Sequence, residues 1–384
     1  MSPTARIYAD YNATAPLRSE PKAAMLRALD LTGNPSSVHA EGRKARTLVE
    51  EAREAVAGAI GACRDDIAFT SGGTEAVGAA IRGALAPAGV DLIASGIEHD
   101  AVLSIAVRDA GWLTQPDGVV DLAWLRARVK SLAADGKMPL VSLMLVNNET
   151  GVIQPVAEAA EIVHAAGGLI HCDAIQALGK TDVSIIELDV DYLSLSAHKI
   201  GGPQGVGAFY VKPGAPFCAV QTGGGQEFGR RAGTENVAGI AGFGAAVEAA
   251  LAGVAQYEGL RVARDAMEAR LKSAAPSLTV HGEAAPRVAG VSCFGVDGLP
   301  SETQIMGLDL AGFAVSAGSA CSSGKVKPSH VLTAMGLSDT AARSAIRASF
   351  GWASKAEDFE ALATAWLKMA ARARPQLVKL DANV

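Results

Sequence analysis

The stretch with the clearest chemical potential is residues 194–203, a run of small and polar residues around Lys199. It follows an apolar run typical of a strand and precedes a glycine-rich turn, so we expect Lys199 at a strand end that faces a cleft. Upstream, a second short apolar run ends in Asp173. A lysine can hold an aldehyde as a Schiff base, and an acid can keep a pyridine nitrogen protonated. The pair indicates a pyridoxal phosphate enzyme; the alternative is an ordinary solvated surface lysine.

A second segment is suited to binding an anion. Residues 71–75 contain two glycines and follow a short strand-like run over 67–70, and a helix of small residues comes next. Glycines let the backbone approach an anion, and a helix N-terminus offers free N–H groups and a favourable dipole. The segment therefore predicts a phosphate cradle. The alternative is an ordinary helix start with Ser71 or Thr74 as the N-cap.

A third feature is Cys321, in a segment over residues 315–324 that consists almost entirely of small or polar residues. Such composition predicts an accessible loop, and the nearby Lys325 and Lys327 favour the thiolate. A loop nucleophile in a chain with a cofactor lysine suggests transfer of a group from bound substrate to the protein itself. The alternative is a surface cysteine without a chemical role.

The remaining cysteines lie in or beside apolar stretches, and we expect them to be buried and inert. The total of five is odd, the spacings are wide, and no pair is separated by only two residues. These facts argue against a disulfide framework and against a structural zinc site. The four residues are Cys63, Cys172, Cys218 and Cys293.

Composition excludes several classes of function. The chain has 384 residues, of which 49% are hydrophobic, so it can bury a large core. The net charge is -6 and no basic tail or run is present, which argues against nucleic acid as a partner. We find no signal-peptide pattern and no apolar run of membrane-spanning length, so we expect a cytoplasmic protein without a membrane partner.

The elements that position these residues alternate between strand and helix. This alternation predicts an α/β fold with a mainly parallel sheet covered on both faces, and such sheets bind ligands at their strand ends. After about residue 235 the composition shifts, which suggests a second, smaller α+β domain. The expected strands are 67–70, 92–95, 140–146, 168–173, 190–196, 205–212 and 288–296. The expected helices are 21–31, 40–60, 156–167, 237–273 (one long helix or a pair), 301–310, 328–336 and 356–373.

Together these motifs resemble the cysteine desulfurases of the nitrogenase-type and housekeeping iron–sulfur assembly systems, which are fold-type I pyridoxal phosphate enzymes. The resemblance runs through nearly the whole chain. It implies a large cofactor-binding domain over 15–250 with a sheet of the seven-stranded type, and a small domain over 1–14 plus 251–384 that carries the cysteine loop (about 315–327). The matching motifs are residues 8–14, 33–37, 71–75, 98–99, 146–151, 171–180, 194–207, 223–227, 230–236, 315–324 and 344–347.

The resemblance also implies a role for each matching residue. Lys199 would hold the pyridoxal 5'-phosphate and later move the Cα proton, Asp173 would pair with the pyridinium nitrogen, and His99 would stack on the ring and transfer protons. Cys321 would attack the sulfur of the substrate. The cofactor would further be held by Gly73, Thr74, Asn148, Gln176, Ser196, His198 and, from a homodimer partner, Thr234, and the substrate carboxylate by Asn148 and Arg347.

The implied reaction removes sulfur from L-cysteine, giving L-alanine and a persulfide on Cys321 that passes to an iron–sulfur scaffold or another acceptor protein. Cys321 could also ligate a cluster transiently, although a persulfide carrier alone is the simpler reading. Two alternatives stay open. One is a selenocysteine lyase or an aminotransferase of the same fold, and an aminotransferase would not need Cys321. The other is a catalytically silent sulfur-carrier or assembly protein, against which the intact Lys199, Asp173 and His99 argue.

Overall fold

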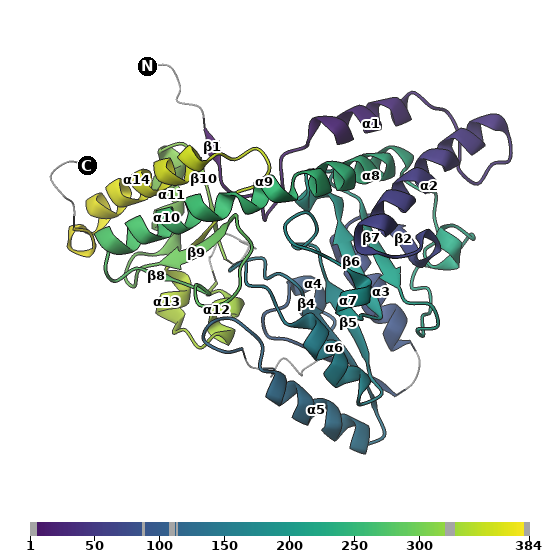
Figure 1. Cartoon of the computed structure of the whole chain (residues 1–384), viewed down its shortest axis with the longest axis horizontal. Coiled ribbons are helices and arrows are strands. Elements are labelled where there is room, and N and C mark those ends of the chain that lie inside the picture. Colours follow the sequence, from purple (N-terminus) through teal and green to yellow (C-terminus); the bar gives the residue numbers. More distant parts are fainter. Residues whose placement is uncertain (1–5, 87–88, 107–111, 113, 319–326, 380–384) are drawn as a thin grey trace.

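The computed structural model describes residues 6–86, 89–106, 112, 114–318 and 327–379, and Figure 1 shows their arrangement. The larger of its sheets has the strands β2 (Ile67–Thr70), β3 (Val90–Ala94), β4 (Met138–Met144), β5 (Leu169–Asp173), β6 (Tyr192–Ser196) and β7 (Gly207–Val211). The order across the sheet is β2-β7-β6-β5-β4-β3. Neighbours from β3 to β6 are parallel, whereas β7 is antiparallel to both β6 and β2. The expected mainly parallel α/β sheet is therefore confirmed.

The number of strands differs from the expected seven-stranded type. The large sheet has six strands in the part of the chain that the structure describes. Past the end of β3, Trp112 makes a single parallel bridge to Ser95. An isolated bridge of this kind extends the sheet edge by one residue pair but does not amount to a strand among the described residues.

The central strands β4, β5 and β6 are buried along nearly their whole length because helices cover both faces of the sheet. One face packs against α3 (Gly73–Leu85) through Leu140, Tyr192 and Phe209. The other face packs against α2 (Ala40–Ile60), α6 (Val156–His164) and α8 (Val237–Ala252). Side chains alternate along a strand, so Asp173 lies on the same face as Leu169, which packs in the α3 cluster. The acid therefore ends its strand on the α3 side.

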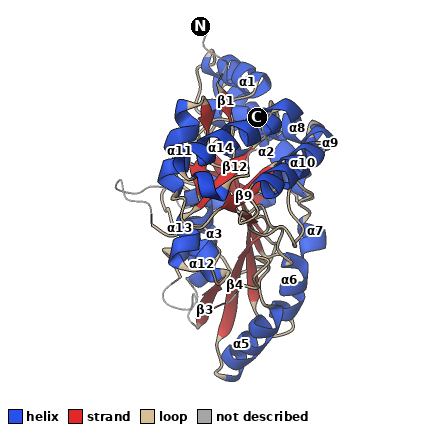
Figure 2. Cartoon of the chain, turned by 90° about the vertical axis from the view of Figure 1, so that its left-hand side faces the viewer, coloured by secondary structure: helices blue, strands red, loops and turns tan. Residues whose placement is uncertain are grey.

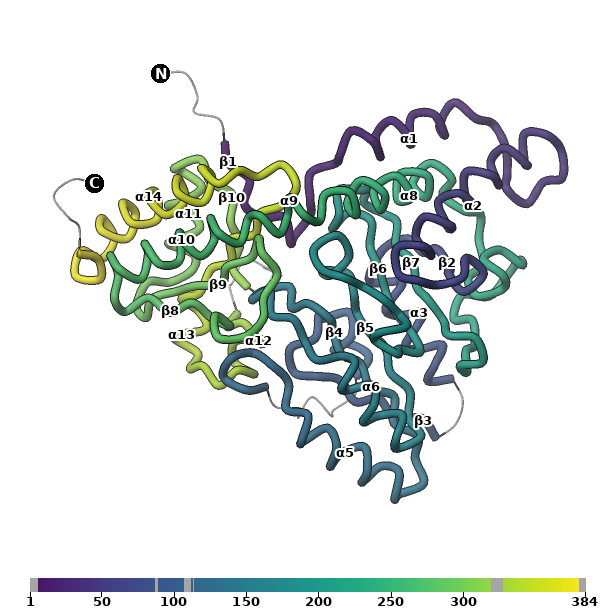
Figure 3. The backbone as a smooth tube through the Cα atoms, viewed as in Figure 1, coloured from purple at the N-terminus to yellow at the C-terminus, as the bar shows by residue number. Residues whose placement is uncertain are grey.

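Three helices form a tightly packed layer at one end of the molecule. The tube in Figure 3 shows α8 running beside α1 (Ser19–Leu29) and α2. Two glycines of α8 permit this approach. A Cβ on Gly244 would lie 2.7 Å from the Cα of Ala52, and one on Gly242 would lie 2.7 Å from the Cγ of Met25. The backbones thus meet too closely for any side chain at these positions.

The chain leaves the large sheet through α8, α9 (Val254–Glu258) and α10 (Leu260–Ala274), so three consecutive helices replace the one long helix or the pair expected over 237–273. Within the described residues no single helix is long and apolar enough to cross a membrane. Taken together, Val237–Ala252 and Val254–Ala274 pass by length and composition, but they are bent by 57° at their break. Most of α8 is buried in the core beneath α1 and α2.

The second sheet is antiparallel and has the order β11-β12-β9-β8. Figure 2 shows β9 and β12 well separated from β3 and β4. The N-terminal arm belongs to this half, because β1 (Ile7–Tyr8) pairs with β10 (Phe313–Ala314) and Asp10 bridges Ser349. The strands are β8 (Thr279–Val280), β9 (Val291–Gly295), β11 (Ser316–Ala317) and β12 (Ala345–Ser349). The remaining helices are α4 (Asp100–Leu103), α5 (Leu122–Ala134), α7 (Ile185–Leu188), α11 (Ser301–Leu310), α12 (His330–Ala334), α13 (Asp339–Arg343) and α14 (Ala356–Ala373).

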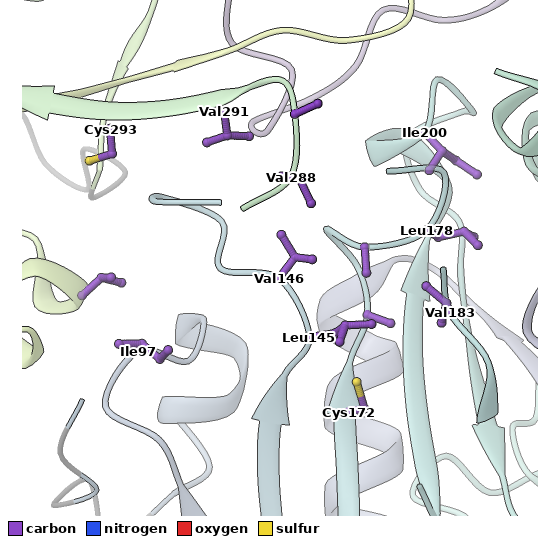
Figure 4. Packing of buried hydrophobic residues seen from close by; sticks show 14 of the residues in the cluster. Ile97, Leu145, Val146, Cys172, Leu178, Val183, Ile200, Val288, Val291 and Cys293 are labelled. Carbon is purple, nitrogen blue, oxygen red and sulfur yellow. The ribbon is translucent and has the colours of Figure 1, made fainter. Parts of the chain in front are cut away.

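One hydrophobic core joins the two sheets, and two of the cysteines are buried in it. Figure 4 shows Val146, just past β4, near Val288 and Val291 of the second sheet. Cys172 and Cys293 are buried in this core, as expected. The expectation was wrong for Cys63 and Cys218, which are exposed, because each lies in a connection that leaves the core rather than in an element.

A buried ion pair ties the glycine-rich segment after β7 to the large sheet. Arg53 of α2 and Glu227 are paired through two contacts, with Nη1 2.5 Å from Oε2 and Nη2 3.1 Å from Oε1. Glu227 also accepts a hydrogen bond from the backbone N–H of Phe69, at 2.8 Å. The two side chains are only 3% and 2% exposed, so neither charge has water as a substitute partner.

We predict that Glu227→Ala lowers the free energy of unfolding by about 3–5 kcal/mol, because it leaves the buried guanidinium of Arg53 with Glu50, at 3.4 Å, as its remaining carboxylate contact. Glu258→Ala is the matched control. It removes an ion pair with Arg261 whose side chains are 50% and 38% exposed. The control should lose less than about 1 kcal/mol. Urea unfolding followed by circular dichroism measures both, and equal losses would contradict the argument.

Candidate active site

Lys199 lies just past the carboxyl end of β6, in the 3-10 turn Ala197–Lys199. Its Nζ donates to two backbone carbonyls of the N-terminal arm, Asn12 at 2.7 Å and Ala13 at 2.8 Å. Burial, reinforced by the positive charge of Arg347, lowers the pKa of Lys199 to about 8, against the opposing pull of Asp173. An amine with this pKa is in part uncharged near neutral pH, which is the form that attacks a carbonyl carbon.

Asp173 ends the neighbouring strand β5, so its carboxyl lies at the same edge of the sheet as Lys199. It is 5% exposed and accepts a hydrogen bond from the backbone N–H of Ile175 at 2.9 Å. Burial raises the pKa of this carboxyl. It forms no ion pair with any residue in the described ranges. A buried carboxylate with this environment is suited to a cationic ring nitrogen.

A second buried acid lies behind Asp173 and was not singled out as a site residue from the sequence. Glu98 Oε1 accepts from the backbone N–H of Met144 at 2.7 Å and from the hydroxyl of Ser95 at 2.9 Å. Burial, and then the nearby charge of Asp173, raise the pKa of Glu98 to about 8. At neutral pH the carboxyl is therefore mostly protonated. The only signal in the sequence is an acid directly after an apolar residue near a strand end.

The predicted phosphate cradle is formed where β2 leads into α3. A cavity of about 440 Å³ is lined by residues 71–75 together with Ser196, His198 and Gln204. The N-cap is Gly72, and no side chain caps the helix, so the reading of Ser71 or Thr74 as an ordinary N-cap is wrong. The free N–H groups of the first turn therefore face the cavity without a side-chain acceptor.

Two details show that this cavity fits a small anion. The hydroxyl of Ser196 is buried and has no hydrogen-bond partner among the described residues. A Cβ on Gly73 would lie 2.6 Å from Cδ1 of Ile175 and 3.2 Å from Cβ of Ser196. Any residue larger than glycine would therefore collide with the side chains that border the cavity. Burial and the charge of Lys199 lower the pKa of His198 to about 4, which keeps its imidazole neutral. The residues present therefore fit the phosphate of the expected cofactor.

His99 is the N-cap of α4. Its Nδ1 accepts a hydrogen bond from the backbone N–H of Ala101 at 3.1 Å. An Nδ1 that accepts leaves the proton of a neutral imidazole on Nε2. The ring itself is exposed, so this Nε2–H is available to a ligand.

The second sheet contributes a cationic clamp. Arg347 of β12 pairs with Asp10 (Nη2 to Oδ1, 2.7 Å) and donates from Nη1 to the backbone carbonyl of Asn148 at 3.0 Å. Its Nε is buried with no partner in the described part of the chain, and the same is true of Oδ1 of Asn148. The unpaired Nε–H of Arg347 is suited to a carboxylate ligand, which Arg binds through two parallel N–H groups.

One expected site residue does not line the cradle, and another lies outside the described residues. Thr234 is exposed in the segment before α8 and is not among the residues that line the cradle of its own chain. Cys321 lies outside the described residues. The strand that leads into its loop, β11, pairs with β12 so that Ser316 is opposite Arg347. The hydroxyl of Ser316 also donates to Oδ2 of Asp10, at 2.7 Å.

The expected cofactor residue Gln176 is buried one turn after β5. Its Nε2 donates to the backbone carbonyl of Asn12 at 2.9 Å, and its Oε1 accepts from Lys180 at 2.6 Å. Lys180 and Asn12 were not named as site residues from the sequence, because nothing in their local patterns signals burial. The described residues contain no cluster of three or more His, Cys, Asp or Glu side chains that could hold a metal ion.

Comparison with known proteins agrees with this geometry. The aminotransferase class-V family model matches residues 7–362. A cysteine desulfurase of Cereibacter sphaeroides is 44% identical over 365 residues, covering 92% of each chain, and cysteine desulfurase IscS of Dictyoglomus turgidum is 40% identical, covering 92% of this chain and 91% of its own. The solved NifS-like protein from Rickettsia africae superposes with a TM-score of 0.84 at 30% identity, covering 95% of this chain and 99% of the other. The chain therefore belongs to the cysteine desulfurases of the class-V aminotransferase family.

Proposed function

We propose that this protein is a pyridoxal phosphate-dependent cysteine desulfurase that converts L-cysteine to L-alanine and collects the sulfur as a persulfide on Cys321. The observation that carries the proposal is the position of Lys199 and the buried Asp173 at the ends of adjacent strands. They lie beside a cradle in which the hydroxyl of Ser196 has no hydrogen-bond partner among the described residues. That arrangement matches the aldehyde, the ring nitrogen and the phosphate of one cofactor. Membership of the family supports the same cofactor and substrate.

The chain's own residues would bind the cofactor at both of its ends. When bound, pyridoxal phosphate withdraws electrons from the substrate Cα, provided that its ring nitrogen is protonated. Asp173 would hold that proton at the nitrogen. His99 would lie against the ring, with Nε2–H free for proton transfer. The remaining contacts would come from Gly73, Thr74, Ser196 and His198 at the phosphate, Gln176 at the phenolate oxygen, and Asn148.

Substrate binding would use the clamp from the second sheet. Arg347 and the amide of Asn148 would hold the carboxylate of L-cysteine, which fixes the Cα–H bond relative to Lys199. The uncharged Nζ would then take the Cα proton and later return one. The pKa near 8 is suited to that double role, because the amine changes charge within the working pH range.

Sulfur transfer would follow at the side chain of the substrate. The thiolate of Cys321 attacks the substrate sulfur, an S–S bond forms, and the C–S bond breaks. The electron pair of the broken bond stays on the substrate carbon, which takes up a proton to become the methyl group of L-alanine. The register between Ser316 and Arg347 supports this step, because the cysteine segment begins beside the residue that holds the substrate.

The partners follow from the same site. Thr234 is exposed and does not line the cradle of its own chain, which supports a homodimer in which it reaches the cofactor phosphate of the other subunit. The persulfide would pass to an iron–sulfur scaffold or another sulfur acceptor.

We also propose a domain division at 15–250 against 1–14 plus 251–384, since β1 pairs with β10 rather than with the large sheet.

The first prediction concerns Cys321. Wild-type protein should release equal amounts of alanine and sulfide from L-cysteine under reductant, and Cys321→Ala should lose both, because no other thiol is placed to receive the sulfur. Cys63→Ala, which removes an exposed cysteine far along the chain, is the control and should keep wild-type rates. Alanine production that persists in Cys321→Ala would favour an aminotransferase or lyase. No turnover by wild type would favour a silent assembly protein.

A second prediction concerns the charge state of Lys199. The rate at which apoenzyme takes up pyridoxal phosphate should rise with pH and reach half its maximum near pH 8, because only the uncharged amine attacks the aldehyde. The increase in cofactor absorbance, with Lys199→Ala as the background, measures this rate. A midpoint near the ordinary lysine value of 10.5 would contradict the effect that we assign to burial.

The third prediction tests the carboxylate clamp by comparing two ligands. Arg347→Gln should weaken competitive inhibition by L-alanine roughly 10- to 100-fold, because a charge-assisted hydrogen-bond pair is lost. Inhibition by ethylamine, which has the same amine and methyl group but no carboxylate, should not change. Equal weakening for both ligands would mean that the substitution disturbs the site as a whole.

A further inference from the structure

Lys180 is a buried lysine that the mechanism above does not use. It lies in the turn that follows Gln176 and is only 7% exposed. It forms no ion pair with a carboxylate anywhere in the described ranges. Burial lowers its pKa well below the usual value, and the charges of Lys199 and Arg347 lower it further. Burying a lysine amine costs free energy unless its N–H groups are hydrogen-bonded.

Its two contacts are both side-chain amide oxygens. Nζ lies 2.8 Å from Oδ1 of Asn12 and 2.6 Å from Oε1 of Gln176. The assignment of these oxygens is independently constrained. Gln176 Nε2 donates to the backbone carbonyl of Asn12 at 2.9 Å, and Asn12 Nδ2 donates to the backbone carbonyl of Asn148 at 3.0 Å. A carbonyl cannot donate, so each amide must direct its nitrogen there and its oxygen to Lys180.

This arrangement works whether or not Lys180 is charged. The two oxygens take two hydrogens, and a neutral amine has two while an ammonium has three. Replacing the lysine by an apolar side chain would leave both oxygens buried without a donor. The orientation of each amide would then depend only on the hydrogen bond from its nitrogen to a backbone carbonyl.

The orientation of the Gln176 amide matters for the cofactor because Nε2 carries two hydrogens and the carbonyl of Asn12 takes only one of them. The backbone carbonyl of Asn12 accepts from Gln176 Nε2 and also from Lys199 Nζ at 2.7 Å, so the amide nitrogen and the reactive amine share one acceptor. In pyridoxal phosphate the phenolate oxygen is bonded to the ring atom next to the one that bears the aldehyde. A donor beside Lys199 would therefore be suited to that oxygen.

We propose that Lys180 is a positioning residue that fixes the amide of Gln176 with its N–H toward the phenolate oxygen of pyridoxal phosphate. The proposal rests on the proposed function, because it takes the cofactor and the contact with Gln176 from there. Without Lys180, the amide oxygen of Gln176 would be buried without a donor, and one of the two contacts that hold its N–H toward the phenolate would be lost. Lys180 thus acts on the cofactor only through Gln176.

The test compares two cofactors in apoenzyme. Pyridoxal phosphate and 3-deoxypyridoxal phosphate, which lacks the phenolate oxygen, are titrated into wild type and Lys180→Met, and absorbance gives each dissociation constant. We expect Lys180→Met to weaken pyridoxal phosphate about tenfold, in line with the loss of one hydrogen bond to a charged acceptor. Binding of the deoxy compound should be unchanged. Equal weakening of both, or of neither, would overturn the proposal.

A double variant tests whether Lys180 acts through Gln176. In Gln176→Leu, adding Lys180→Met should change the dissociation constant of pyridoxal phosphate by less than about twofold, because the group through which Lys180 acts is gone. A tenfold change there would show that Lys180 acts by another path. If Lys180→Met does not fold, Lys180→Gln, which can still donate one hydrogen bond, replaces it in the same two-cofactor comparison. Neither titration needs turnover, so failure of the desulfurase assay leaves this test intact.

Discussion

The constraint on which the site depends is the removal of the Asp173 carboxyl from water. A buried carboxylate is costly unless a positive charge faces it and no second negative charge lies near. Lys199 at the next strand end supplies part of that positive field, and the ring nitrogen of the cofactor would supply the rest. Glu98 avoids the competing charge, because burial and Asp173 raise its pKa to about 8 and keep it mostly protonated at neutral pH. A protonated Glu98 thus places no second negative charge beside the carboxyl of Asp173.

The N-terminal arm connects this charge arrangement to the substrate clamp. The backbone carbonyl and the side chain of Asn12 receive Lys199, Gln176 and Lys180, which all follow strands of the large sheet. Two residues earlier, Asp10 pairs with Arg347 and with Ser316, both on the second sheet. The arm therefore lies between the two sheets and touches both. In the proposed mechanism the cofactor is held at the large sheet, the guanidinium that binds the carboxylate comes from the second sheet, and the arm contacts both.

Sequence reasoning succeeded where chemistry and local pattern agree. Lys199 and Asp173 each follow a strong apolar run, and parallel strands bring their carboxyl ends to one edge, so residue type and strand order together predicted the pair. The cradle over residues 71–75 was predicted in the same way. Local pattern failed for Cys63 and Cys218, because apolar neighbours in sequence do not reveal that a connection turns outward. The local pattern gave no indication that Lys180 is buried, since a lysine in a turn is normally solvated.

By itself the sequence determined the α/β class, the main strands and helices, the family, and the residues whose chemistry the cofactor requires. These follow from periodicity and from residue type, which are properties of short segments. Only the tertiary structure decided which charges are buried and which polar groups lack a partner. Glu98, Lys180 and the unpaired hydroxyl of Ser196 acquire their roles from neighbours far away in the chain. Desolvation and hydrogen-bond geometry depend on all surrounding elements at once, so no single segment encodes them.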